Sequence, residues 1–333
     1  MRYPLFYLGA GALSAGLAAA LCALLTPCVL RLALRLGAAH APRERDVHVE
    51  PIPRWGGIAI FAAFSLTLLL TALVVHFVAH RHIADRTLQA GIGVVLAGVI
   101  LTVVGAIDDR RELSAGKQLL AQLFCAWLVT RFGIRIDFIT NPFGDGMIPL
   151  AWWVSYPITV LWLVGVANAV NWIDGIDGLA AGVSAIAAFT LALMAAWRNQ
   201  PGLTMLAAAL FGSLIGFLPY NSNPAKIFMG GGAQVVGFTL ASISTSGAFK
   251  APVAMAFAVP ILVLALPILD TTAVILKRWR SGRPIYEADQ SHLHHRLLAR
   301  GFTQRQTVLI LYGISFSLCL VAFGAFMLMS ARG

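Results

Sequence analysis

Residues 56–78 read GGIAIFAAFSLTLLLTALVVHFV and contain no Lys, Arg, Asp or Glu. A helix needs about 20 mostly apolar residues to cross a hydrocarbon core about 30 Å thick, so this stretch is long enough to span a membrane. Similar uncharged runs separate Arg2 from Arg31 and Arg305 from Arg332. Of the 333 residues, 11% are charged, whereas soluble domains carry about 25%. The sequence therefore predicts an all-α polytopic integral membrane protein.

The uncharged runs predict about ten transmembrane helices in a single domain of residues 1–333. Their expected bounds are 6–36, 56–78, 88–107, 117–133, 153–171, 178–197, 203–220, 233–248, 252–276 and 306–329. The helix at 117–133 is the shortest between charges, because Lys117 and Arg131 flank it. Both side chains can extend to the membrane interface, so this span remains in the prediction.

The basic residues predict the orientation of these helices. The loops around 37–55, 108–117, 171–178, 220–232 and 277–305, with the cations at adjoining helix ends, hold 16 of the 24 Lys and Arg residues. Cytoplasmic loops carry the excess of Lys and Arg, so these loops are expected in the cytoplasm and both termini outside. The net charge of +10 fits anionic lipid headgroups and requires no nucleic acid.

Two adjacent carboxylates, Asp108 and Asp109, end one predicted span on this side. Neighbouring like charges repel unless a cation or metal offsets them, so the pair suits metal binding or proton abstraction. The following Arg110 and Arg111 could equally pair with them at a solvated helix end. The residues alone leave both interpretations open.

The stretch at 168–178 reads NAVNWIDGIDG and places an oxygen-bearing side chain at every third position: Asn168, Asn171, Asp174 and Asp177. On a regular helix such a stripe drifts by about 60° per step. A broken helix end, which Gly175 and Gly178 permit, would keep the groups together. Oxygen ligands suit Mg²⁺, with Mn²⁺ as an alternative, rather than zinc. Simple helix capping needs fewer such groups, so we predict a metal site.

Residues 289–301 read DQSHLHHRLLARG and predict a short amphipathic helix that stops at Gly301. His292, His294, His295 and Arg296 suit the binding of a diphosphate. Zinc binding and a plain solvated helix are the alternatives. Thr303 and Gln306 then fit a capping box for the last span.

Two further polar positions stand beside apolar helices. Arg54 lies in the juxtamembrane stretch PIPRWGG at 51–57 and could hold a lipid phosphate or serve as a topology anchor. Asp270 lies within an apolar helix, where a carboxylate is functional by default. An ion pair with Lys277 is its structural alternative.

Taken together, these stretches resemble the polyprenyl-phosphate N-acetylhexosamine-1-phosphate transferases, a glycosyltransferase family that also includes phospho-MurNAc-pentapeptide translocase. The matching segments occur in family order over nearly the whole chain: 51–57, 106–110, 168–179, 221–237, 267–271 and 292–301. The stretch at 171–179 is highly specific for the family. The form HLHHR at 292–296 looks closer to the N-acetylglucosamine branch.

The resemblance implies transfer of N-acetylhexosamine-1-phosphate, with GlcNAc-1-phosphate favoured, from a UDP-sugar to undecaprenyl or another polyprenyl phosphate, releasing UMP. This is a step of cell-wall, lipopolysaccharide or other surface polysaccharide synthesis at a bacterial inner membrane. The implied cofactor is Mg²⁺ or Mn²⁺, and a homodimer is a candidate assembly.

The resemblance also implies roles for the motif residues. The metal positions are Asn171, Asp174 and 231, the catalytic acids Asp108, Asp109 and Asp177, and the substrate contacts Asn168, His292, His294, His295, Arg296 and Arg54. The family usually has Met-Gly-Asp where this chain has Met229-Gly230-Gly231. Gly231 therefore lacks the usual metal-binding carboxylate. A catalytically weakened relative that binds the same ligands is one alternative, and a membrane transporter is another.

Overall fold

The computed structural model describes residues 4–40, 51–77, 85–140, 147–246, 258–284 and 291–330. These residues form twelve α-helices and two short antiparallel ribbons. Parts of two loops predicted to be cytoplasmic, residues 41–50 and 285–290, lie outside the described residues, as do residues 252–257 of the predicted ninth span.

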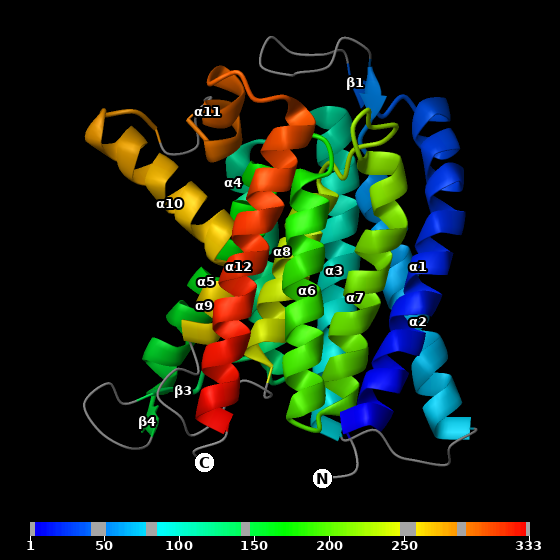
Figure 1. Cartoon of the computed structure of the whole chain (residues 1–333), viewed down its shortest axis with the longest axis vertical. Helices are drawn as coiled ribbons and strands as arrows, with labels where there is room; N and C mark the ends of the chain where they lie inside the picture. Colours follow the sequence, from blue (N-terminus) through cyan, green and yellow to red (C-terminus); the bar gives the residue numbers. More distant parts are fainter. Residues whose placement is uncertain are drawn as a thin grey trace.

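The long helices run side by side as a bundle, α10 leans away from it, and α11 lies at one end (Figure 1). The helices are α1 Pro4–Arg35, α2 Gly56–Phe77, α3 Asp85–Arg111, α4 Ala115–Arg131, α5 Trp152–Ile173, α6 Leu179–Trp197, α7 Pro201–Asn221, α8 Gly232–Thr245, α9 Ala258–Val263, α10 Ala265–Arg280, α11 Leu293–Ala299 and α12 Gln304–Ser330. The ribbons pair β1 Ala39–His40 with β2 Ile52–Pro53, and β3 Phe138–Thr140 with β4 Met147–Pro149.

Seven helices of the described chain are long and apolar enough to cross a membrane: α1, α2, α3, α5, α6, α7 and α12. This confirms the predicted class, an all-helical multi-pass membrane protein. The predicted span at 117–133 corresponds to α4, which also has 17 residues and begins two residues earlier, and the predicted span at 233–248 corresponds to α8, which has 14 residues. The predicted helix at 252–276 is broken at Leu264 into α9 and α10. Pro267 explains the break, because it has no N–H to donate to the preceding turn.

Close glycine contacts hold the bundle together. An added Cβ on Gly212 of α7 would lie 2.0 Å from the Ala15 oxygen of α1, and one on Gly216 would lie 2.3 Å from the Ala19 oxygen. Glycines four residues apart allow two membrane helices to approach backbone to backbone.

A second glycine contact joins α2, α3 and α8. An added Cβ on Gly231 would lie 2.3 Å from Gly105 Cα, and one on Gly232 would lie 2.2 Å from Gly57 Cα. The segment before α8 also pairs with the start of α2, where Gly57 N–H donates to the Met229 oxygen. The end of α3 is thus held against the start of α8.

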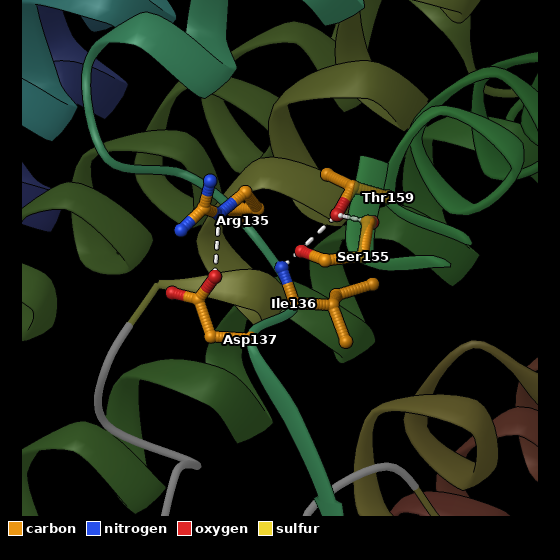
Figure 2. A network of polar contacts seen from close by, with 5 residues as sticks. All are labelled: Arg135, Ile136, Asp137, Ser155 and Thr159. Atoms are coloured by element: carbon orange, nitrogen blue, oxygen red, sulfur yellow. Dashed lines mark hydrogen bonds and ion pairs between the residues drawn. The ribbon is translucent and has the colours of Figure 1, made fainter. Parts of the chain in front are cut away.

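At the opposite end of the bundle from α11, the segment after α4 is tied to α5 (Figure 2). The Ile136 N–H donates to the Thr159 hydroxyl oxygen at 3.0 Å, and that hydroxyl donates to the Ser155 oxygen at 2.7 Å. Arg135 and Asp137 form an ion pair beside them. The start of α1 and the end of α12 lie at this same end (Figure 1).

The α1–α7 contact predicts that Gly212→Ala destabilises the protein, because the new methyl group would overlap a backbone oxygen. We expect a loss of about 1–3 kcal/mol, measured as a lower unfolding midpoint of the purified protein in detergent. Gly313→Ala in α12 is the control, because an added Cβ there meets nothing within 4 Å. Equal midpoints for both variants would contradict the packing described here.

Candidate active site

The acidic loop connects α5 to α6. Helix α5 ends at Ile173, and the Asp174 N–H donates to the Asn171 oxygen at 3.3 Å. Gly178 has a φ of 78°, a conformation that suits glycine, and precedes the first residue of α6. The predicted break of the helix near Gly175 and Gly178 is confirmed. It brings Asp174 and Asp177 into electrostatic interaction.

Asp177 anchors the acidic loop to the turn that follows α7. It is 2% exposed. Its Oδ2 accepts hydrogen bonds from Asn223 Nδ2 and from the Ala225 N–H, both at 3.0 Å. Asn223 also hydrogen-bonds Gln304 at the start of α12. Asp177 therefore joins three segments that are distant in the sequence.

Asp109 at the end of α3 lies at the start of α8. The Gly231 N–H donates to both of its carboxylate oxygens, at 3.2 and 3.1 Å. Asp109 interacts electrostatically with Arg54 and with Asp174. Arg54 also interacts with Asp174, so a half-buried guanidinium is shared by an acid of α3 and an acid of the acidic loop.

The surroundings of Asp174 raise the pKa of its carboxyl group. Its partly buried position raises its pKa to about 7, and the neighbouring Asp177 acts in the same direction, while Arg54 opposes the shift. A carboxylate in such a position gains stability from an added cation, because the cation offsets the lost hydration.

Helix α11 is docked by Asp270 of α10. Asp270 Oδ2 lies 2.8 Å from His292 Nδ1, and Oδ1 accepts the Leu293 N–H at 2.8 Å. The partner of Asp270 is thus His292 rather than Lys277, whose Nζ bonds the Ser291 hydroxyl. The predicted stop at Gly301 and the capping box of Thr303 and Gln306 are confirmed.

The three predicted histidines lie next to one another. The His292 and His294 rings stack at 5.6 Å, and His295 lies 4.3 Å from His294 between ring centroids. His294 is 2% exposed and packs on the acidic loop, because an added Cβ on Gly175 would lie 2.4 Å from its Nε2. Gly175 leaves the space that this imidazole occupies.

Burial lowers the pKa of His294 to about 3, and the neighbouring His295 and His292 add to the shift while Asp270 opposes it. His294 is therefore neutral near pH 7, and its Nε2 has no hydrogen-bond partner among the described residues. Such an imidazole can accept or donate one hydrogen bond but adds no positive charge. Arg296, on the same helix, is exposed.

Asp108 and Asn168 are engaged by glutamines that the sequence analysis did not single out. Asp108 Oδ1 accepts the Leu113 N–H and Gln118 Nε2, at 2.8 and 2.9 Å. Asn168 Nδ2 donates to Gln122 Oε1 at 2.6 Å. Gln118 and Gln122 are four residues apart in α4, which places them about one helical turn apart. Two polar amides with this spacing in a predicted membrane helix could have identified them from the sequence.

The side chains of this site suit a Mg²⁺ ion that is bound partly by the protein and partly by a substrate. They do not suit an ion that is enclosed by protein ligands alone. The described residues contain no cluster of three or more His, Cys, Asp or Glu side chains able to hold one ion. Gly231 has no side chain and no space for one. Mg²⁺ is commonly bound by one or two carboxylates together with water and substrate phosphates. Asp174, with Asn171 one turn before it, fits that pattern.

Comparison with known proteins gives consistent likenesses. A profile described as glycosyl transferase family 4 matches residues 91–248. A probable undecaprenyl-phosphate N-acetylglucosaminyl 1-phosphate transferase of Bacillus subtilis is 39% identical over 294 residues, which cover 88% of this chain and 78% of the relative. A decaprenyl-phosphate N-acetylglucosaminephosphotransferase of Mycobacterium tuberculosis is 36% identical over 89% and 77% of the two chains. An undecaprenyl-phosphate alpha-N-acetylglucosaminyl 1-phosphate transferase of Escherichia coli is 26% identical over 84% and 74%.

The matched profile contains the acid pair, the acidic loop and the glycine contact of α8. The similarity to the Bacillus relative extends over most of both chains. The chain therefore belongs to glycosyl transferase family 4.

Proposed function

We propose that the protein transfers N-acetylglucosamine-1-phosphate from UDP-N-acetylglucosamine to a polyprenyl phosphate, in the synthesis of a cell-envelope polymer. The observation that carries this proposal is the convergence of Arg54, Asp109 and Asp174 at one end of a membrane bundle. An acceptor lipid can reach such a site from the bilayer, and a soluble sugar nucleotide can reach it from the water.

In the proposed reaction, an oxygen of the lipid phosphate bonds to the sugar-linked phosphorus of the UDP-sugar. The bond from that phosphorus to the bridging oxygen breaks, and UMP leaves. Asn171 and Asp174 would hold Mg²⁺ together with phosphate oxygens. The ion, when bound, supplies charge that neutralises the meeting phosphates.

Side chains of the protein orient the reactants and offset the phosphate charge that the metal ion does not neutralise. Arg54 draws a phosphate towards Asp109 and Asp174, where its guanidinium already acts. A carboxylate oxygen of Asp109 accepts the proton of the lipid phosphate. Asp177 holds the acidic loop in place through Asn223 and Ala225. The neutral His294 offers one hydrogen bond beside Gly175.

We propose the orientation that the basic residues predict, with this end in the cytoplasm and the termini outside. In it α4, α8 and the α9–α10 pair complete ten membrane passages within one domain. Some passages would then be made by helices of fewer than 18 residues, which a tilted bundle and a locally thinner bilayer accommodate.

Asp174→Asn should reduce transfer by about a hundredfold or more, because loss of a metal-binding carboxylate removes several kcal/mol of charge stabilisation. The assay is the formation of extractable labelled lipid from labelled UDP-N-acetylglucosamine. The control is Asp137→Asn, the same change on an acid at the other end of the bundle. Undiminished transfer by Asp174→Asn would exclude the assigned metal site, and no labelled lipid from the wild type would favour a silent relative or a transporter.

Gly231→Asp and Gly231→Asn should both lower the unfolding midpoint, because any Cβ at this position overlaps Gly105. The two side chains have the same size, so their comparison separates bulk from charge. We expect similar losses of transfer and similar Mg²⁺ dependence for both. A lower Mg²⁺ requirement for the Asp variant alone would mean that a carboxylate at 231 reaches the metal.

Gly175→Ala should reduce transfer about tenfold by displacing His294 from the acidic loop. Removing the imidazole removes the overlap, so the double variant Gly175→Ala with His294→Ala should perform as well as His294→Ala alone. The measurement is transfer at saturating substrate for the three variants. Independent, additive losses would show that the two residues are not in contact in the working protein.

A further inference from the structure

A continuous line of side-chain hydrogen bonds crosses four helices and ends on Asp108. Its members are Asn168 of α5, Gln122 of α4, Gln234 of α8, Gln118 of α4 and Asp108 of α3. Asn168 Nδ2 donates to Gln122 Oε1 at 2.6 Å, and Gln122 Nε2 donates to Gln234 Oε1 at 3.0 Å. Gln234 Nε2 donates to Gln118 Oε1 at 2.7 Å, and Gln118 Nε2 donates to Asp108 Oδ1 at 2.9 Å.

The centre of this amide chain is buried. Gln122 is 1% exposed and Gln234 is 6% exposed. Buried amides in a membrane bundle are costly unless their donors and acceptors are paired, and paired networks specify one arrangement of the helices. The glutamines therefore hold α3, α4, α5 and α8 in a defined relation.

At both ends, the direction of the amide chain is set by groups that can accept hydrogen bonds but cannot donate them. The Asp108 carboxylate requires Gln118 to present its NH₂ group, which leaves Gln118 Oε1 to accept from Gln234. At the other end, Asn168 Nδ2 also donates to the Val164 carbonyl at 2.8 Å. Turning over any one amide would place like groups against each other. Gln122 Nε2 also donates back to Asn168 Oδ1 at 3.3 Å, whereas the bonds from Gln122 through Gln234 and Gln118 all donate towards Asp108.

The first turn of α8 consequently holds both acids of the pair. The Gly231 N–H binds Asp109, and Gln234, three residues later, holds Asp108 through Gln118. We propose that Gln118, Gln122 and Gln234 are positioning residues for phosphoryl transfer, which set Asp108 and, through the shared last turn of α3, its neighbour Asp109. The reaction itself rests on the proposed function, whereas the chain of hydrogen bonds can be tested without it.

The first experiment removes a donor from the middle of the chain and then supplies another. Gln234→Glu is isosteric but cannot donate to Gln118, so it should lower the unfolding midpoint in detergent. Gln118 cannot turn over in response, because its Nε2 also donates to the Leu113 oxygen. Gln118→Lys offers donors to residue 234, to Asp108 and to the Leu113 oxygen. We expect the double variant Gln234→Glu with Gln118→Lys to regain much of the midpoint that Gln234→Glu loses. Additive losses would show that the groups do not form one directional chain.

The second experiment tests the catalytic consequence. Gln234→Met keeps the length of the side chain and removes its hydrogen bonds. The control is Thr239→Val on the same helix, because within the described part of the chain the buried Thr239 hydroxyl bonds only the Val235 oxygen of its own helix. We expect Gln234→Met to lower kcat about tenfold or more, with KM for UDP-N-acetylglucosamine within about twofold of the control.

The outcomes separate the two proposals. An unchanged kcat in folded Gln234→Met would reduce the glutamines to a purely structural role and overturn the positioning proposal. A wild-type protein without transfer would overturn the proposed function and the catalytic part of this inference together. In that case, recovery of stability in the double variant would still establish the amide chain.

Discussion

Backbone contact at the glycine-rich start of α8 is the constraint on which the candidate site depends. Gly231 and Gly232 lie against Gly105 and Gly57, at distances that leave no space for a Cβ. Because the backbones approach so closely, the end of α3 reaches the first N–H groups of α8. Asp109 can therefore accept the Gly231 N–H, and side chains at these positions would separate the two helices.

The same contact explains how several acids coexist at the end of an apolar bundle. Helix α8 contributes an N–H donor from its positive end, and Arg54 contributes a guanidinium that acts on Asp109 and Asp174. Asp177 Oδ2 accepts two hydrogen bonds from the turn after α7. Asp174 keeps a raised pKa because burial outweighs the effect of Arg54. Asp174 is therefore an acid whose ionised form an added metal ion would stabilise.

The histidines of α11 lie next to one another but have different partners. His292 pairs with Asp270 and serves to dock α11. His294 is buried and neutral against Gly175. A neutral His294 adds no positive charge, so in the proposed reaction the charge that offsets a diphosphate would come from arginines such as Arg54.

Local properties of the chain were enough to determine the membrane class, most helix bounds and the break after Ile173. Uncharged length decides whether a segment can cross a bilayer, and glycines allow a helix to end where the acids cluster. The acid pair, the acidic loop and Arg54 could be selected because such groups are rare beside apolar helices. The break at Leu264 was missed, since hydropathy does not register the loss of a backbone hydrogen bond at Pro267. Only the tertiary structure decided the partners: Gln118 for Asp108, Gly231 for Asp109, Asp270 for His292. Each partner lies on another segment, and a hydrogen bond across helices depends on distances that spacing along the chain does not contain.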